Sequence, residues 1–202
     1  MTWQEPIILA SGSPRRRQLL ESSGWQVSVH PPHVDDGQLD SRDVPARAWV
    51  AAMAWFKARS VLQEIATRSS GTILSADTVC ELDEEVIGQP PDADAARTMI
   101  RKFRNRSHRV LTGVCLLTTD GVRREIFADT AEVTMGALSD EAIETYLATD
   151  GWRGKAGGYN LFDRVADGWP LEWIGDESTV VGLPMRRLQK IFPAHEPLDG
   201  HA

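Results

Sequence analysis

The sequence has only two cysteines, Cys80 and Cys115, and no apolar run long enough to cross a membrane. Both cysteines lie in apolar segments without the spacing of a metal site, so we expect two reduced, buried thiols rather than a disulfide. The first ten residues carry no basic region before their short apolar run, which argues against a signal peptide. These absences predict a cytoplasmic protein with no membrane partner.

Positive charge is also in deficit. The chain carries 22 Lys and Arg against 29 Asp and Glu, a net charge of −7. A nucleic-acid-binding module neutralises many phosphates, so this balance argues against one. The phosphate-binding patterns GxxxxGK[ST] and GxGxxG are absent as well. What remains open is a small, local anion site.

Segments with the patterns of strands and helices alternate along the whole chain. We expect strands at residues 6–10, 25–30, 72–79, 110–119 and 122–135, around Tyr159, and at 171–174. We expect helices from the turn at Ser13 to 23–24, at 44–65, from a cap at Asp92 or Asp94 to Phe103, and at 139–149 and 183–192.

Turn signals at 83–84 and 120–121 join neighbouring strands into hairpins, so the sheet is not purely parallel. The sequence therefore predicts an α/β fold with a mixed sheet. We expect one domain over residues 1–192 and a disordered tail at 193–202.

The stretch LASGSPRRRQLL, residues 9–20, passes from an apolar strand through a tight turn into a helix. The free N–H groups at such a helix start, with the hydroxyls of Ser11 and Ser13, form a cradle for an anion. Arginine is unfavourable there for an isolated helix, but a bound polyphosphate reverses this. Successive helical residues lie about 100° apart, so at least one of the three arginines faces solvent. The alternative is a solvated basic helix start that binds nothing.

The stretch SADTV places Asp77 at the end of an apolar strand, where ligands often bind in α/β proteins. Its carboxylate is suited to holding a metal or activating water, although it also fits a strand-end residue that caps a loop. Lys57 lies on the long helix, and Lys155 lies in the glycine-rich loop 150–158. Each is either a phosphate ligand or an ordinary solvated lysine.

Histidines and aspartates gather in the stretch VHPPHVDD, residues 29–36. Mg²⁺ prefers carboxylate oxygens, so Asp35 and Asp36 are better candidates for a metal site than His30 and His33. For the two histidines we expect a polar surface loop.

Seven stretches, in order along the chain, resemble the motifs of one family. They are LASGSPRRRQLL, VDD at 34–36, FKARS, SADTVC, RNRSHRVLTGVCL, GKAGGY and VVGLPMRRL. Together they extend over nearly the whole chain, from Ile7 to Ile191. The sequence thereby resembles the Maf-type nucleoside-triphosphate pyrophosphatases, a family first named for septum-formation inhibition.

This resemblance implies an elongated fold with two lobes around a cleft, related to the inosine-triphosphate pyrophosphatases. It implies hydrolysis of a nucleoside triphosphate to a nucleoside monophosphate and pyrophosphate, assisted by a divalent metal cation, Mg²⁺ or Mn²⁺. The implied role is removal of surplus or non-standard nucleotides, with an effect on cell division. Family members are often homodimers.

The resemblance also implies roles residue by residue. Asp77 matches the general base that activates water. Asp36, with Asp35 as its backup, matches the acidic metal position beside Asp77. The residues that match substrate-binding positions are Ser11, Ser13, Arg15, Arg16, Lys57 and Lys155. Arg17 falls outside the family's arginine pair.

Two positions depart from the family pattern. Gln89 stands where the family has a lysine, and Phe162 stands where it has a glutamine of the site. Phe162 is suited to stacking on a base instead. These departures leave open a second hypothesis, a catalytically weak nucleotide-binding regulator. The stretch ADTV favours the subgroup that prefers thymidine and uridine triphosphates.

Overall fold

The computed structural model describes residues 3–34, 41, 43–65 and 70–192, so the tail predicted at 193–202 lies outside the described residues. The strands are β1 (Ile7–Ala10), β2 (Val27–Val29), β3 (Thr72–Leu82), β4 (Glu85–Ile87), β5 (Arg106–Thr118), β6 (Arg124–Met135) and β7 (Leu171–Ile174). The helices are α1 (Pro14–Glu21), α2 (Ala46–Ile65), α3 (Ala93–Phe103), α4 (Asp140–Leu147), α5 (Leu161–Ala166), α6 (Glu177–Val181) and α7 (Met185–Ile191). A 3₁₀ turn, η2, spans Ala156–Gly158.

The seven described strands join one sheet, in the order β2-β1-β3-β5-β6-β7, with β4 paired to β3 at the side. β1 is parallel to β2 and β3, whereas every other pairing described is antiparallel. The predicted α/β class with a mixed sheet is therefore confirmed. The two predicted hairpins are confirmed as well, because β3 pairs with β4 and β5 with β6 around the turns.

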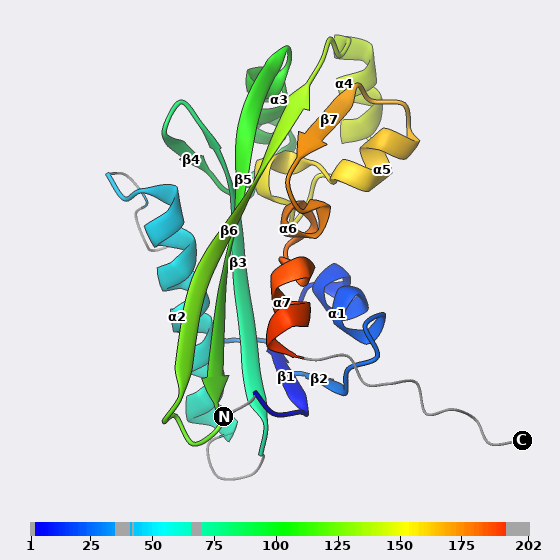
Figure 1. Cartoon of the computed structure of the whole chain (residues 1–202). Coiled ribbons are helices and arrows are strands. Elements are labelled where there is room, and N and C mark those ends of the chain that lie inside the picture. The colour runs from blue at the N-terminus through cyan, green and yellow to red at the C-terminus, as the bar shows by residue number, and fades with distance from the viewer. Residues whose placement is uncertain (1–2, 35–40, 42, 66–69, 193–202) are drawn as a thin grey trace, which may run out of the picture.

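Three long strands, β3, β5 and β6, run through both lobes of an elongated molecule (Figure 1). In one lobe the sheet lies between α2 on one face and α1 and α7 on the other, whereas α3, α4 and α5 gather in the second lobe. Each face of the first lobe has its own core. Ala58 and Ile73 pack on the α2 side, and Leu20 and Leu188 pack on the opposite side. The three long strands thus connect the two lobes and form part of the sheet in each.

Helix α2 approaches the sheet closely at Gly113, which lies opposite Asp77 in the register of β5 and β3. A Cβ atom at residue 113 would stand 2.2 Å from the carbonyl oxygen of Val50, closer than real Cβ contacts come. Glycine is therefore the residue that permits this approach. The backbone of α2 passes directly over the part of the sheet that carries Asp77.

Strand β3 continues further than the sequence pattern indicates. The pattern predicts its end at residue 79, but the strand runs to Leu82, because β4 and β5 both pair with its last residues. Asp77 therefore lies in the middle of a strand, and the prediction of a strand-end carboxylate is wrong.

The strand predicted around Tyr159 is also wrong. Gly157 and Gly158 adopt φ angles of 68° and 78°, which turn the chain, and Asn160 caps α5 directly afterwards. Tyr159 is left between η2 and α5 with its side chain buried. The sequence analysis also missed α5 and α6, because helices of six and five residues are too short to show a helical period.

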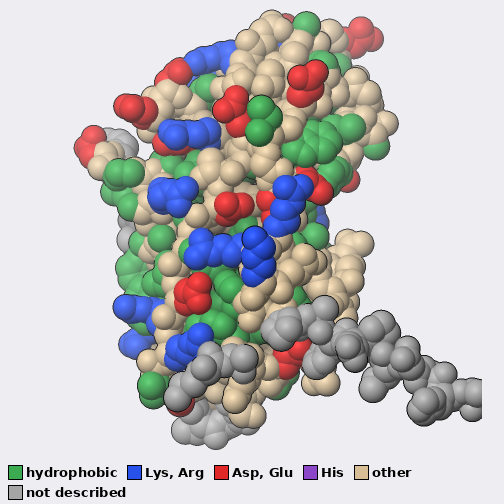
Figure 2. Space-filling view, in the orientation of Figure 1, with side chains coloured by type: hydrophobic (Ala, Val, Ile, Leu, Met, Phe, Trp, Pro, Cys, Tyr) green, Lys and Arg blue, Asp and Glu red, His purple; other side chains and the backbone are tan. Residues whose placement is uncertain are grey.

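Cys80 and Cys115 are free and buried, as predicted, and burial raises the pKa of each thiol to about 12. Within the described ranges, no helix has both the length and the apolar character needed to cross a membrane. Although the chain is acidic overall, Figure 2 shows Lys and Arg side chains gathered across the middle of one face.

A buried histidine links β5 to the core of the second lobe. His108 is 2% exposed and stacks on Phe103 with 4.0 Å between the ring centroids. Its Nε2 lies 2.7 Å from the hydroxyl of Tyr159. Burial lowers the pKa of His108 to about 4, so the folded protein holds this imidazole neutral near pH 7.

We predict that His108 destabilises the fold on acidification. The unfolded chain takes up the proton near the ordinary pKa of 6.5, and the folded chain only near 4. The unfolding free energy therefore falls as pH drops through this window, by about 3 kcal/mol for this one group. Urea unfolding at pH 7 and pH 4 should show wild type losing that much more stability than His108→Gln. An identical pH dependence in both proteins would contradict the prediction.

Candidate active site

The turn between β1 and α1 has the geometry of the predicted anion cradle. Ser13 caps α1 by accepting a hydrogen bond from the N–H of Arg16, and Ser11 Oγ accepts the N–H of Ser13 at 3.2 Å. Neither hydroxyl donates its own proton to another described residue. Both serines line a cavity of about 720 Å³, so these protons are available to an anion there.

The three arginines of α1 point in different directions, as their angular spacing requires. Arg17 is exposed and pairs with Glu21 at 2.7 Å, which confirms that one arginine faces solvent. Arg15 lines the cavity beside the cradle. Burial lowers the pKa of Arg15, and the nearby carboxylate of Asp163 acts against this shift. Arg15 is therefore a cation that faces the cavity.

Arg16 turns inward and ties separate segments together. Its guanidinium donates to the carbonyl oxygens of Gly182 at 3.0 Å and Ala76 at 2.8 Å. It also donates to the hydroxyls of Ser11 at 3.2 Å and Thr78 at 3.0 Å. Four of its five N–H groups are thereby used within the protein. The main effect of Arg16 is to hold β3 on either side of its central carboxylate.

That carboxylate, Asp77, forms a mostly buried ion pair with Lys57. Lys57 Nζ on α2 donates to Asp77 Oδ1 on β3 at 2.6 Å, and the two side chains are 15% and 12% exposed. Lys57 is therefore not an ordinary solvated lysine. The ion pair fixes the direction of the carboxylate, and Oδ2 of Asp77 accepts no hydrogen bond from another described residue. Oδ2 is thus available to a water molecule or a cation.

Lys155 reaches the same place from the loop before η2. Its ammonium donates to the carbonyl oxygen of Gly151. Burial lowers the pKa of Lys155, and the positive charge of Arg15 adds to this shift. A cavity of about 100 Å³ is lined jointly by Ser13, Arg15, Arg16, Lys57, Asp77 and Lys155. The structure thus brings together the predicted substrate-binding residues around Asp77, with Ser11 in the adjoining cavity.

The candidate metal ligands at residues 30–36 follow the end of β2 in the chain. Asp35 and Asp36 lie outside the described residues. His30 Nε2 and His33 Nδ1 lie 2.7 Å and 3.1 Å from the carboxylate oxygens of Glu64 on α2, and these bonds lower the pKa of Glu64. The histidines lie at the surface, as predicted. Among the residues that the structure describes, no three His, Cys, Asp or Glu are grouped to hold a metal ion.

Residues that the sequence analysis did not select also line the larger cavity. They are Arg153, Asn160 and Asp163, together with Gln89, which was identified only as a departure from the family pattern. Asn160 and Asp163 lie within two residues of Phe162, which also departs from the family pattern. That departure was the sequence signal that could have identified these two residues as part of the site. Phe162 itself is 42% exposed and contacts Trp173 edge-on, with 6.0 Å between the ring centroids.

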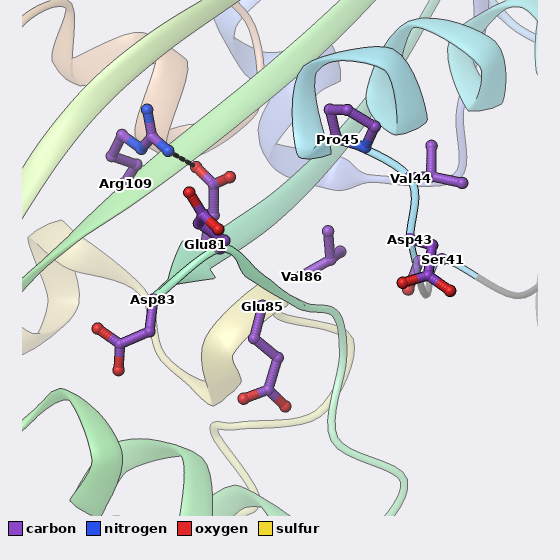
Figure 3. A pocket seen from close by; sticks show the side chains of 10 residues that line it. Ser41, Asp43, Val44, Pro45, Glu81, Asp83, Glu85, Val86 and Arg109 are labelled. Atoms are coloured by element: carbon purple, nitrogen blue, oxygen red, sulfur yellow. Dashed lines mark ion pairs between the residues drawn. The ribbon is translucent and has the colours of Figure 1, made fainter.

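A different cavity, of about 870 Å³, lies between the segment before α2 and the β3–β4 hairpin (Figure 3). Its acidic lining residues are Asp43, Glu81, Asp83, Glu84 and Glu85. Arg109 supplies the positive charge among the described lining residues. Its guanidinium forms an ion pair with the carboxylate of Glu81 at 2.5 Å (Figure 3). This surface repels a polyphosphate, so we place the candidate site in the cationic cavities around Asp77.

Residues 6–194 match the family described as Maf-like protein. The dTTP/UTP pyrophosphatase of Salinibacter ruber is 39% identical over 191 residues, which cover 94% of this chain and 90% of that protein. The dTTP/UTP pyrophosphatase of Pyrococcus furiosus is 37% identical, covering 92% and 93%. Among solved structures, the Ham1 protein of Staphylococcus aureus is 15% identical with a TM-score of 0.45, covering 77% of this chain and 79% of that one.

We predict that Arg16 stabilises the fold far more than its neighbour Arg17. Lysine at position 16 has at most three donors and no planar fork, so buried carbonyl and hydroxyl groups lose their donors. Arg16→Lys should lower the free energy of unfolding by about 3 kcal/mol. The matched control Arg17→Lys changes an exposed ion pair and should cost less than about 0.5 kcal/mol. Equal losses in urea unfolding would rule out the structural role of Arg16.

Proposed function

The chain belongs to the Maf family, and we propose that it hydrolyses nucleoside triphosphates to a nucleoside monophosphate and pyrophosphate. The observation that carries the proposal is the oriented carboxylate of Asp77 in one cavity with the cations Arg15, Lys57 and Lys155. The names of the curated relatives support dTTP and UTP as the substrates of this chain as well.

In the proposed reaction a water molecule attacks the α-phosphorus. Asp77 accepts the proton of this water through Oδ2, which Lys57 leaves open while it holds Oδ1. The bond between the α-phosphorus and the bridging oxygen breaks, and pyrophosphate leaves with the bonding electrons. Asp77 then returns its proton to solvent.

The cations would counter the charge of the substrate. A nucleoside triphosphate carries several negative charges near pH 7, and preorganised positive charge is usually the largest catalytic contribution in such reactions. Arg15 and Lys155 line the cavity and would bind the phosphates that leave, while the hydroxyls of Ser11 and Ser13 would donate hydrogen bonds to them. Arg16 keeps one N–H for the substrate and otherwise positions β3.

A divalent cation, Mg²⁺ or Mn²⁺, fits this donor set. Mg²⁺ is commonly held by one or two carboxylates together with substrate phosphates and water, so it needs no cluster of protein ligands. Asp77, with Asp36 or Asp35, would hold it. When bound, the metal supplies positive charge that polarises the phosphate oxygens.

Further proposals rest on the family resemblance alone. They are removal of surplus or non-standard nucleotides, a link to cell division and homodimer formation. A cytoplasmic location stays a proposal from the sequence, which has no basic region before its first apolar run. The organisation as a single domain over residues 1–192 has additional support, since one sheet joins all the described strands. A catalytically weak nucleotide-binding regulator remains the alternative function.

We predict that Asp77→Asn abolishes turnover and retains binding. The amide accepts no proton from water, so the rate of pyrophosphate release should fall by about 10²–10⁴-fold. Triphosphate binding should persist or tighten, because a negative charge is removed from the cavity. The assay is pyrophosphate release from a panel of standard and modified nucleoside triphosphates with Mg²⁺ or Mn²⁺.

The matched control for Asp77→Asn is Asp94→Asn, which changes an exposed aspartate at the start of α3. Its turnover should equal that of wild type. If wild type binds triphosphates and turns over none of the panel, catalysis is rejected in favour of the regulator.

We predict a phosphate-binding role for Lys155. Lys155→Met removes a cation from the cavity and should weaken pyrophosphate binding about tenfold, measured by isothermal titration calorimetry. Lys102→Met removes an exposed lysine that pairs with Glu85 and lines neither cationic cavity, so it should leave pyrophosphate binding unchanged. Equal affinities in both variants would exclude Lys155 from the phosphate site.

A further inference from the structure

Two cavities of different character meet at Asp77. The first is the cavity with Arg15, Lys57 and Lys155. The second, of about 280 Å³, shares Asp77, Thr78 and Gln89 with the first. Its other lining residues are Trp49, Met53, Val79 and Gly88. Apart from Asp77 itself, the described lining of this second cavity carries no charged side chain. The first cavity is therefore cationic, whereas the second is neutral apart from the shared carboxylate.

This polarity orients a nucleoside triphosphate. The bond broken in the proposed reaction joins the α-phosphate to the two phosphates that leave, so the α-phosphorus must lie beside Asp77. The leaving phosphates then belong among Arg15 and Lys155, where their charge is countered. The nucleoside, on the opposite side of the α-phosphate, is directed to the neutral cavity.

We propose that the neutral cavity is the nucleobase subsite, with Trp49 as its stacking surface and Gln89 as the group that contacts the edge of the base. The proposal rests on the proposed function for its direction, because that function places the α-phosphate at Asp77. It assigns a specificity-determining role to Trp49, which no sequence motif selected, and to Gln89, which the motifs marked only as a departure from the family pattern.

Trp49 is placed by the same helix that supplies Lys57. Trp49, Met53 and Lys57 follow one another at four-residue spacing and so form a row along α2. Trp49 is half-buried and packs against the cluster that contains Val79 of β3, which fixes its ring beside the strand of Asp77. An aromatic ring held in this way gives a base a stacking surface without needing contact to any particular base edge.

Gln89 supplies the polar contact. Its side chain is exposed and makes no hydrogen bond to another described residue, so both its carbonyl and its amide are available. An adjacent acceptor and donor match the N3–H and C4 carbonyl of thymine or uracil. The preceding residue is anchored, because the carbonyl oxygen of Gly88 accepts the N–H of Gly157 at 2.9 Å. This bond ties the segment that carries Gln89 to η2, directly after Lys155.

The test measures the two halves of the substrate separately. Binding of uridine monophosphate and of pyrophosphate is measured by isothermal titration calorimetry in wild type, Trp49→Ala, Trp49→Phe and Gln89→Ala. Trp49→Ala should weaken uridine monophosphate binding about tenfold and leave pyrophosphate binding unchanged. Trp49→Phe keeps an aromatic ring and should restore most of the affinity. Gln89 also borders the cationic cavities, so Gln89→Ala should weaken uridine monophosphate binding more than pyrophosphate binding.

The matched control is Trp55→Ala, since Trp55 lies on the same helix and lines neither cavity. It should bind both ligands as wild type does. The proposal is overturned if wild type fails to bind uridine monophosphate, or if folded Trp49→Phe, Trp49→Ala and Gln89→Ala all bind it with wild-type affinity. Failure of the proposed function is a separate result, because these measurements require no turnover.

Discussion

The ion pair between Lys57 and Asp77 is the interaction on which the arrangement of this site depends. It joins α2, on one face of the sheet, to the middle of the central strand β3 at 2.6 Å. Both side chains are mostly buried, so each charge needs the other, and removing one would leave an uncompensated charge inside the protein. Arg16 adds a second cation beside Asp77, and its burial is made tolerable by the four hydrogen bonds it donates.

The local features of the site could be predicted from the sequence, because local chemistry determines them. A strand followed by Ser-Gly-Ser-Pro predicts a capped helix with free N–H groups, and Ser13 does cap α1. The spacing of helical residues sends Arg15, Arg16 and Arg17 in different directions, and Arg17 does face solvent. The motifs also selected the residues around Asp77, since they follow the family pattern.

What could not be predicted depends on contacts between distant segments. β3 extends past residue 79 because β4 and β5 pair with it, and a single strand's composition does not reveal its partners. Tyr159 looks like a strand residue, but the positive φ angles of the glycines before it and the buried bond to His108 place it in a turn. The inward direction of Arg16 likewise depends on carbonyl groups from β3 and from the end of α6.

Gly113 makes the arrangement of the site depend on a residue that lines none of its cavities. Any side chain at this position would collide with the backbone of α2 at Val50 and push the helix away from the sheet. Because α2 is a continuous helix of 20 residues, it would move as a rod, and Trp49 and Lys57 would be displaced together. A single methyl group at this position would thus disturb the ion pair of Asp77 and the position of Trp49 in one step, although Gly113 has no side chain of its own with which to contact either residue.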